Sequence, residues 1–131
     1  MKKIPFFLGF VIFFFFSCAL YAYDGITFYG AEISQSDRFN SDGQRLTTVS
    51  DILRQDRANY YVYGKPNKHD QPDDYFTTKA HRDIFDSAKI IIDPKLAQEI
   101  IYSNQPVLIS VFVYSPTEIH IEPGLPDPHT D

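Results

Sequence analysis

The chain is poor in cysteine: Cys18 is the only one among its 131 residues, so no disulfide can form within the chain. The sequence also lacks a glycine-rich phosphate loop, a Gly-x-Ser-x-Gly elbow and a His-Glu-x-x-His motif. No pair of acidic residues is set apart by its neighbours as a catalytic acid and base. From these absences we predict no catalytic residue, no bound metal and no cofactor, and we favour a protein that is not an enzyme.

Basic residues are outnumbered as well. The chain carries 12 Lys and Arg against 17 Asp and Glu, a net charge of −5. Residues 1–22 hold two of the lysines and no acid, so their removal leaves a net charge of −7. Such an acidic protein is a poor ligand for nucleic acid or for an anionic membrane surface. It suits a basic protein partner, because complementary charge speeds encounter.

The chain opens with a basic pair, Lys2-Lys3, followed by an apolar segment rich in phenylalanine. A basic start, an apolar centre and small residues at the end are typical of a secretory signal peptide, here residues 1–22 with cleavage after Ala22. An uncleaved anchor is the alternative, because the apolar segment is close to the ~20 residues that span a bilayer. Cys18 suggests a lipoprotein, but the residues before it make a poor lipobox. We expect a periplasmic or secreted protein without stable membrane association after cleavage.

The remaining chain is long enough for one compact domain and too short for two. We predict that residues 23–122 form this domain and that the Pro-rich stretch 123–131 is a disordered tail. The patterns described next favour a small α+β fold. Its sheet is mixed or antiparallel, and two or three helices pack on one face of that sheet.

In the first half of the domain, an aromatic and β-branched stretch predicts a strand over 26–33, with a glycine weak point at Gly30. A polar surface loop follows as far as Arg45. Thr48 then caps a helix that ends near Gly64. The helix turns one broad apolar face toward the core, formed by Val49, Ile52, Leu53 and Tyr60.

A hydrophilic connection over 65–74 leads to a second helix, which begins at about Asp73 or at Thr78. A short buried strand is predicted at 90–92, and Asp93-Pro94 after it is typical of a helix start.

The apolar, β-branched run Val107–Tyr114 indicates an interior strand. A strand, a helix and a strand in this order predict a βαβ unit, in which 90–92 pairs in parallel with 107–114.

The chain then turns at residues 115–117 into a last strand, 118–122, which alternates polar and apolar residues. Because every second residue of a strand points the same way, Ile119 and Ile121 face the helices. The opposite side gathers aromatic and acidic residues, which we predict to form a protein-binding patch: Phe112, Tyr114, Glu118, His120 and Glu122. Two alternatives remain open, the ordinary solvated face of an antiparallel pair and a metal site made by one histidine and two glutamates.

Together these features favour an exported, non-catalytic module that binds another protein, such as an inhibitor, an immunity protein or an accessory protein. One rival hypothesis is a small hydrolase or metal-dependent enzyme that uses His120 or His81 with nearby carboxylates. Another is a purely structural subunit. The sequence specifies neither the partner nor the strand order nor the oligomeric state.

Overall fold

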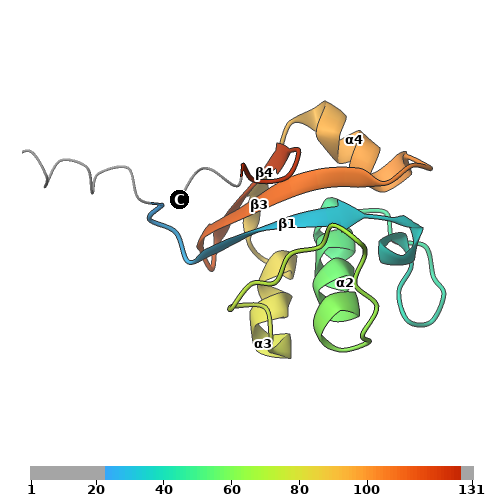
Figure 1. Ribbon diagram of the computed structural model, residues 1–131, viewed down its shortest axis with the longest axis horizontal. Helices are drawn as coiled ribbons and strands as arrows, with labels where there is room; N and C mark the ends of the chain where they lie inside the picture. Colours follow the sequence, from blue (N-terminus) through green and yellow to red (C-terminus); the bar gives the residue numbers. More distant parts are fainter. Residues whose placement is uncertain (1–22, 128–131) are drawn as a thin grey trace, which may run out of the picture.

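The computed structural model describes residues 23–127, so the predicted signal peptide 1–22 and residues 128–131 lie outside the described residues. Within them, three α-helices and two short 3-10 helices accompany a four-stranded mixed sheet (Figure 1). This is the small α+β fold that the sequence predicted. No helix within residues 23–127 has the length and apolar character needed to cross a bilayer. In chain order the elements are β1 (Thr27–Ile33), η3 (Gln35–Arg38), α2 (Val49–Tyr61), α3 (Lys79–Arg82), η4 (Asp83–Asp86), β2 (Lys89–Ile91), α4 (Pro94–Tyr102), β3 (Val107–Ser115) and β4 (Glu118–Pro123).

The strands are ordered β1-β3-β4-β2, with β3 antiparallel to both β1 and β4 and with β2 parallel to β4. The predicted parallel pairing of β2 with β3 is therefore wrong. β3 has only two edges, and these are occupied by its hairpin partner β4 and by the long strand β1. The prediction of a buried strand is also corrected. Lys89 and Ile91 are exposed at the edge of the sheet, whereas Ile90 and the next residue but one, Ile92, are half-buried against the core.

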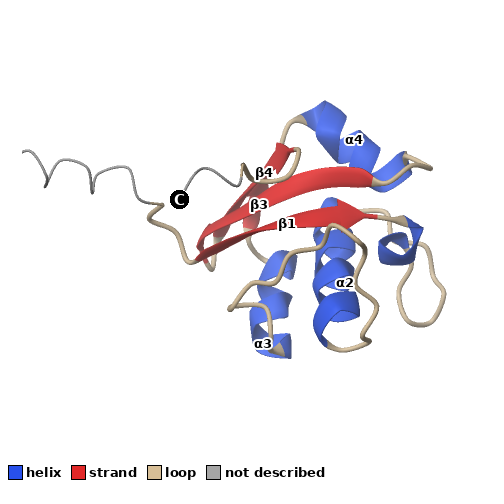
Figure 2. Ribbon diagram, viewed as in Figure 1, coloured by secondary structure: helices blue, strands red, loops and turns tan. Residues whose placement is uncertain are grey.

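Strand alternation packs one face of the sheet against the helices. In the interior strand β3 the buried set is Val107, Ile109, Val111 and Val113, as the alternation predicted. The same core contains side chains from α2 and from α4, so both helices lie on this face, with α4 toward the β4 side (Figure 1). Figure 2 shows α2 and α3 together on one side of the strands. The helical members of the core are Ile52, Leu53, Leu96, Ile100 and Ile101.

Local signals set the bounds of α2. The Thr48 side chain accepts a hydrogen bond from the backbone nitrogen of Asp51 at 3.1 Å, which satisfies one of the free donors in the first turn. The helix ends at Tyr61, and Gly64 beyond it has a φ of +62°, in the left-handed region that favours glycine.

The second helix is much shorter than predicted, because α3 spans only Lys79–Arg82 before the 3-10 helix η4. Thr78 caps α3, as the later of the two predicted starts requires. The earlier start at Asp73 is wrong. The Oδ2 atom of Asp73 accepts from the backbone nitrogens of Tyr75 at 2.8 Å and Phe76 at 2.6 Å, a local turn that competes with helix formation.

The polar stretch before α2 is anchored rather than free. Arg38 is fully buried, and its Nε donates to the carbonyl oxygen of Ile100 at 2.8 Å. Arg45 Nη2 donates to the carbonyl oxygen of Ile101 at 2.6 Å. Both arginines thus bind carbonyls in the last turn of α4, where the helix dipole favours positive charge. The prediction of a plain surface loop is corrected on this point.

The C-terminal segment crosses the open face of the sheet. Pro123 is the last residue of β4, and the backbone nitrogen of Gly124 donates to the carbonyl oxygen of Leu108 at 2.8 Å. Ser110 Oγ donates to the carbonyl oxygen of Gly124 at 2.7 Å, and Ser110 is buried beneath this segment. Farther along, Pro126 packs on Gly30, where an added Cβ atom would lie 2.8 Å from Pro126 Cδ. Gly30 therefore provides space for a close contact.

Candidate functional site

The face of the sheet that points away from the helices carries a group of side chains that we call the aromatic face. Phe28 of β1 pairs with Phe112 of β3, and Phe112 pairs with His120 of β4. Strand periodicity brings Tyr114 to the same side, and Tyr23, which precedes β1, lies against these rings. Phe28 and Tyr114 are 45% and 44% exposed, so the group is open to solvent. The aromatic face comprises Tyr23, Phe28, Phe112, Tyr114 and His120.

Tyr23 connects these rings and is itself tied to the backbone. Its hydroxyl lies 2.8 Å from the carbonyl oxygen of Val113 and 3.0 Å from that of Thr27, and it donates to them. Partial burial, together with the nearby phenol of Tyr114, raises the pKa of Tyr23 to about 12, so the hydroxyl keeps its proton at neutral pH. The ring centroid of Tyr23 lies 5.4 to 5.9 Å from those of Phe28, Tyr114 and Phe112. The sequence pattern does not indicate Tyr23, because its position before the first strand gives no sign of this contact.

Acidic side chains border the aromatic face. His120 Nε2 donates to Glu118 Oε2 at 2.9 Å, and the His120 ring lies 4.6 Å from that of Tyr114 in an edge-to-face arrangement. Glu118 is about half exposed, and Glu122 is exposed farther along the same strand. The five residues predicted as a patch therefore share one face of the sheet. Their role in binding stays a prediction.

The metal-site alternative finds no support in this geometry. Glu118 and His120 contact each other at 2.9 Å, but two side chains are fewer than the three or four protein ligands that a zinc site uses. Within residues 23–127, no three His, Cys, Asp or Glu side chains are placed so that they could hold a metal ion.

A second concentration of polar groups lies inside the molecule, where α2 meets η3 and the 65–76 connection. We call it the buried polar cluster. Its five side chains are hidden from solvent or nearly so: Asp37, Asp56, Arg57, Asn59 and Asp73. Because unpaired buried charges are costly, the contacts among these groups decide whether the fold tolerates them.

Arg57 lies at the centre of the buried polar cluster. Its Nε donates to Asp56 Oδ2 at 2.9 Å, and its Nη1 donates to Asp73 Oδ1 at 2.8 Å. The guanidinium carbon also lies 4.0 Å from the ring centroid of Tyr29 and 4.9 Å from that of Tyr60, both within cation–π range. Burial raises the pKa of Asp56 well above its usual value, and the positive charge of Arg57 partly offsets this.

Asp37 organises the other half of the cluster. Its Oδ1 accepts from Asn59 Nδ2 at 2.9 Å and its Oδ2 accepts from Asn67 Nδ2 at 2.7 Å. Burial raises the pKa of Asp37, and these hydrogen bonds partly offset the rise. Nearby, Asp70 Oδ1 accepts from the backbone nitrogen of Glu32 at 2.8 Å. These hydrogen bonds therefore hold the hydrophilic connection 65–74 against the edge of β1. The polar atoms of the cluster bind one another, so we assign the cluster a structural role.

The buried polar cluster was not predicted from the sequence, although α2 contains a signal for it. The helical spacing of Val49, Ile52 and Leu53 continues to Asp56 and Arg57. Charged residues at these positions must turn toward the core with the apolar ones. Charged residues at apolar positions of a helix pattern indicate buried charges, but they do not indicate which residues pair with those charges.

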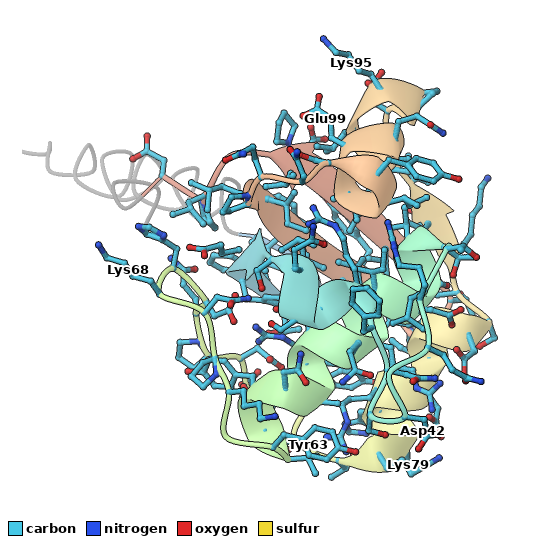
Figure 3. The ribbon with its side chains drawn as sticks, turned by 90° about the vertical axis from the view of Figure 1, so that its right-hand side faces the viewer. Asp42, Tyr63, Lys68, Lys79, Lys95 and Glu99 are labelled. Carbon is cyan, nitrogen blue, oxygen red and sulfur yellow. The ribbon has the colours of Figure 1, made fainter. Side chains whose placement is uncertain are left out.

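A cleft of about 550 Å³ lies along the outer side of α2, beside the loop after η3 and beside α3. Figure 3 shows Tyr63 and Lys79, which line the cleft, at the same end of the molecule as Asp42. Arg54 also lines it, but this guanidinium already contacts Asp83 at 3.3 Å and Asp86 at 3.5 Å. The positive charge of Arg54 is thus balanced within the chain, and the cleft presents no group set apart for chemistry.

The histidines of the rival enzyme hypothesis occupy separate places. His81 Nδ1 donates to the carbonyl oxygen of Tyr75 at 2.7 Å, and the two rings stack at 3.9 Å. His120 lies on the aromatic face with Glu118 as its hydrogen-bond partner. Neither arrangement combines a histidine, a nucleophile and a second acid, so the described residues give the enzyme hypothesis no specific support.

Comparison with known proteins yields no relative: no family model, no curated protein and no solved structure matches this chain.

Proposed function

We propose that this protein is an exported, non-catalytic module that binds a basic protein through the aromatic face. The observation that carries the proposal is that two rings of the aromatic face, Phe28 and Tyr114, are exposed on the part of the sheet face that the C-terminal segment leaves open. Aromatic side chains are enriched at protein interfaces and among the residues that contribute most to binding. Large rings exposed to solvent do not stabilise the folded monomer, so a group of them indicates an interaction site.

Charge supports the choice of a basic partner. Glu118 and Glu122 flank the rings, and the chain as a whole carries −5. A cationic protein is drawn toward such a surface before contact, and its Lys and Arg side chains can lie over the exposed rings while pairing with the glutamates. The N-terminal sequence supports export, which places the partner outside the cytoplasm. An inhibitor, an immunity protein or an accessory protein fits these properties.

The test uses the mature domain, residues 23–131, as bait in extracts of the producing cells. Phe28→Ala and Tyr114→Ala should each lose a basic partner that the wild type retains. An aromatic anchor that contributes about 2 kcal/mol corresponds to about a 30-fold rise in Kd. Tyr102→Ala is the matched control, because Tyr102 is 64% exposed on α4, away from the aromatic face.

Thermal melts of all three variants establish that each one is folded. Retention of the partner by a Phe28→Ala, Tyr114→Ala double variant would contradict the proposed surface. Equal loss by Tyr102→Ala would show that the contact is not specific to the aromatic face.

A further inference from the structure

Three polar atoms of the buried polar cluster and its neighbour Tyr29 have no hydrogen-bond partner: Tyr29 Oη, Asp56 Oδ1 and Arg57 Nη2. All three residues are at most 1% exposed, so bulk solvent does not reach these atoms. Buried polar atoms in folded proteins are almost always paired, because leaving one unpaired costs about 1–3 kcal/mol. The three residues are in contact through Arg57, which pairs with Asp56 and stacks on the ring of Tyr29, so we look for one explanation for all three atoms.

The ion pair between Asp56 and Arg57 contains one hydrogen bond where its geometry allows two. Nε and Nη2 lie on the same edge of the planar guanidinium group, and a carboxylate can bind both with its two oxygens. Here Asp56 Oδ2 binds Nε at 2.9 Å, while Asp56 Oδ1 and Arg57 Nη2 have no hydrogen-bond partner. Tyr29 belongs to the same place, because Arg57 lies 4.0 Å over its ring.

The chemistry of the three atoms determines what can join them. Nη2 only donates, which disfavours a cation, and the carboxylates of Asp56 and Asp73 disfavour an anion. Asp56 Oδ1 accepts when the carboxyl group is ionised, and Tyr29 Oη can donate or accept. A small neutral molecule with both donors and acceptors satisfies all three.

We propose that one internal water molecule binds Tyr29 Oη, Asp56 Oδ1 and Arg57 Nη2 and completes the buried polar cluster. Three hydrogen bonds are typical of a buried water in a globular protein. The water accepts from Nη2, donates to Oδ1 and uses its remaining capacity for the phenol. If Asp56 is protonated on Oδ1, the water reorients and accepts a hydrogen bond from that O–H group. The site therefore holds water in both protonation states of Asp56.

A high-resolution crystal structure of the mature domain tests the site directly. The expected result is a single ordered water about 2.7–3.2 Å from each of the three atoms. A carboxylate of Asp56 that binds both Nε and Nη2, or a direct bond from Tyr29 Oη to Asp56, with no water between the groups, would overturn the proposal.

Two phenylalanine substitutions give a second readout in solution. Tyr29→Phe should lower the melting temperature and remove one long-lived water from the magnetic relaxation dispersion of solvent oxygen-17. Tyr61→Phe is the matched control. It loses the direct hydrogen bond to Asp73 Oδ1 at 2.9 Å, so it should lower the melting temperature but keep the water. An unchanged or higher melting temperature for Tyr29→Phe would show that its hydroxyl has no bound partner, and this result overturns the site.

Discussion

Replacing Arg57 by methionine should be among the most destabilising single changes in this domain. Methionine has a similar length, fills most of the same space and lacks the charge. The change leaves two carboxyl groups, Asp56 and Asp73, buried without the cation that lies 2.9 Å and 2.8 Å from them. It also removes the cation stacked over Tyr29.

The expected loss follows from the burial of all three side chains, which are 0% exposed. Removing one partner of a buried ion pair costs about 3–5 kcal/mol. Domains of this size have total stabilities of about 5–15 kcal/mol, so the variant should keep only a fraction of the wild-type stability or unfold. Urea unfolding followed by circular dichroism measures the difference.

Arg54→Met is the control, because Arg54 lies on the same helix and also contacts two aspartates, Asp83 and Asp86. These side chains are 37–49% exposed, and exposed pairs contribute about 0–1 kcal/mol. If Arg57→Met and Arg54→Met lose similar stability, the argument from burial is wrong. A second check is Asp56→Asn added to Arg57→Met, which removes one stranded carboxylate and should recover part of the loss.

Further predictions concern pH, packing and processing. Burial raises the pKa of Asp37 and of Asp56, so the stability that these two groups contribute is fully present below the unfolded pKa of 3.8 and is lost as pH rises through their folded pKa values. Urea titrations should therefore show a larger contribution of the two groups to the free energy of unfolding in mild acid than at neutral pH. The double variant Asp37→Asn, Asp56→Asn should flatten this dependence on pH. Gly30→Ala should cost about 1–3 kcal/mol by thermal melting, because its methyl group meets Pro126, Leu125 and Gln71; deletion of 125–131 should reduce this penalty but leave the part due to Gln71. Ile121→Ala should lose about 2–5 kcal/mol and Tyr114→Ala much less, and equal losses would mean that both faces of the sheet are covered. If residues 1–22 are a cleaved signal, the intact mass of the exported protein should correspond to a chain that begins at Tyr23, whereas a full-length mass would contradict cleavage.

Local patterns predicted much of the fold because the interactions behind them are local. The start of α2 follows from Thr48 and its bond to the backbone of Asp51, three residues away. Likewise, Asp93 accepts from the backbone nitrogen of Lys95, and Pro94 begins α4. The two faces of β3 follow from strand alternation, which needs no knowledge of the neighbouring strands.

The predicted patch depended on the same alternation, and its five residues do lie on one face of the sheet, while their role in binding stays a prediction. Two aromatic members of the exposed face, Tyr23 and Phe28, were missing from it. They come from the opposite end of the domain, and only the pairing of β1 with β3 brings Phe28 beside Phe112, which is 84 residues later in the chain. Register between distant strands is a property of the assembled sheet, and the composition of one strand does not encode it.

Tertiary structure alone decided the rest. β2 lies at the edge of the sheet because β1 and β4 occupy both sides of β3, and Ser110 is buried because Gly124 crosses above it. Helix periodicity turned Asp56 and Arg57 inward, but a buried charge is tolerated only with partners, and these include Asp73 from a different segment. The sequence by itself determined where most helices and strands begin and which face of each is apolar, because those are set within a few residues. Strand order, the covering of Ser110 and the pairing of buried charges arise from contacts between distant residues, which exist only once the chain has folded.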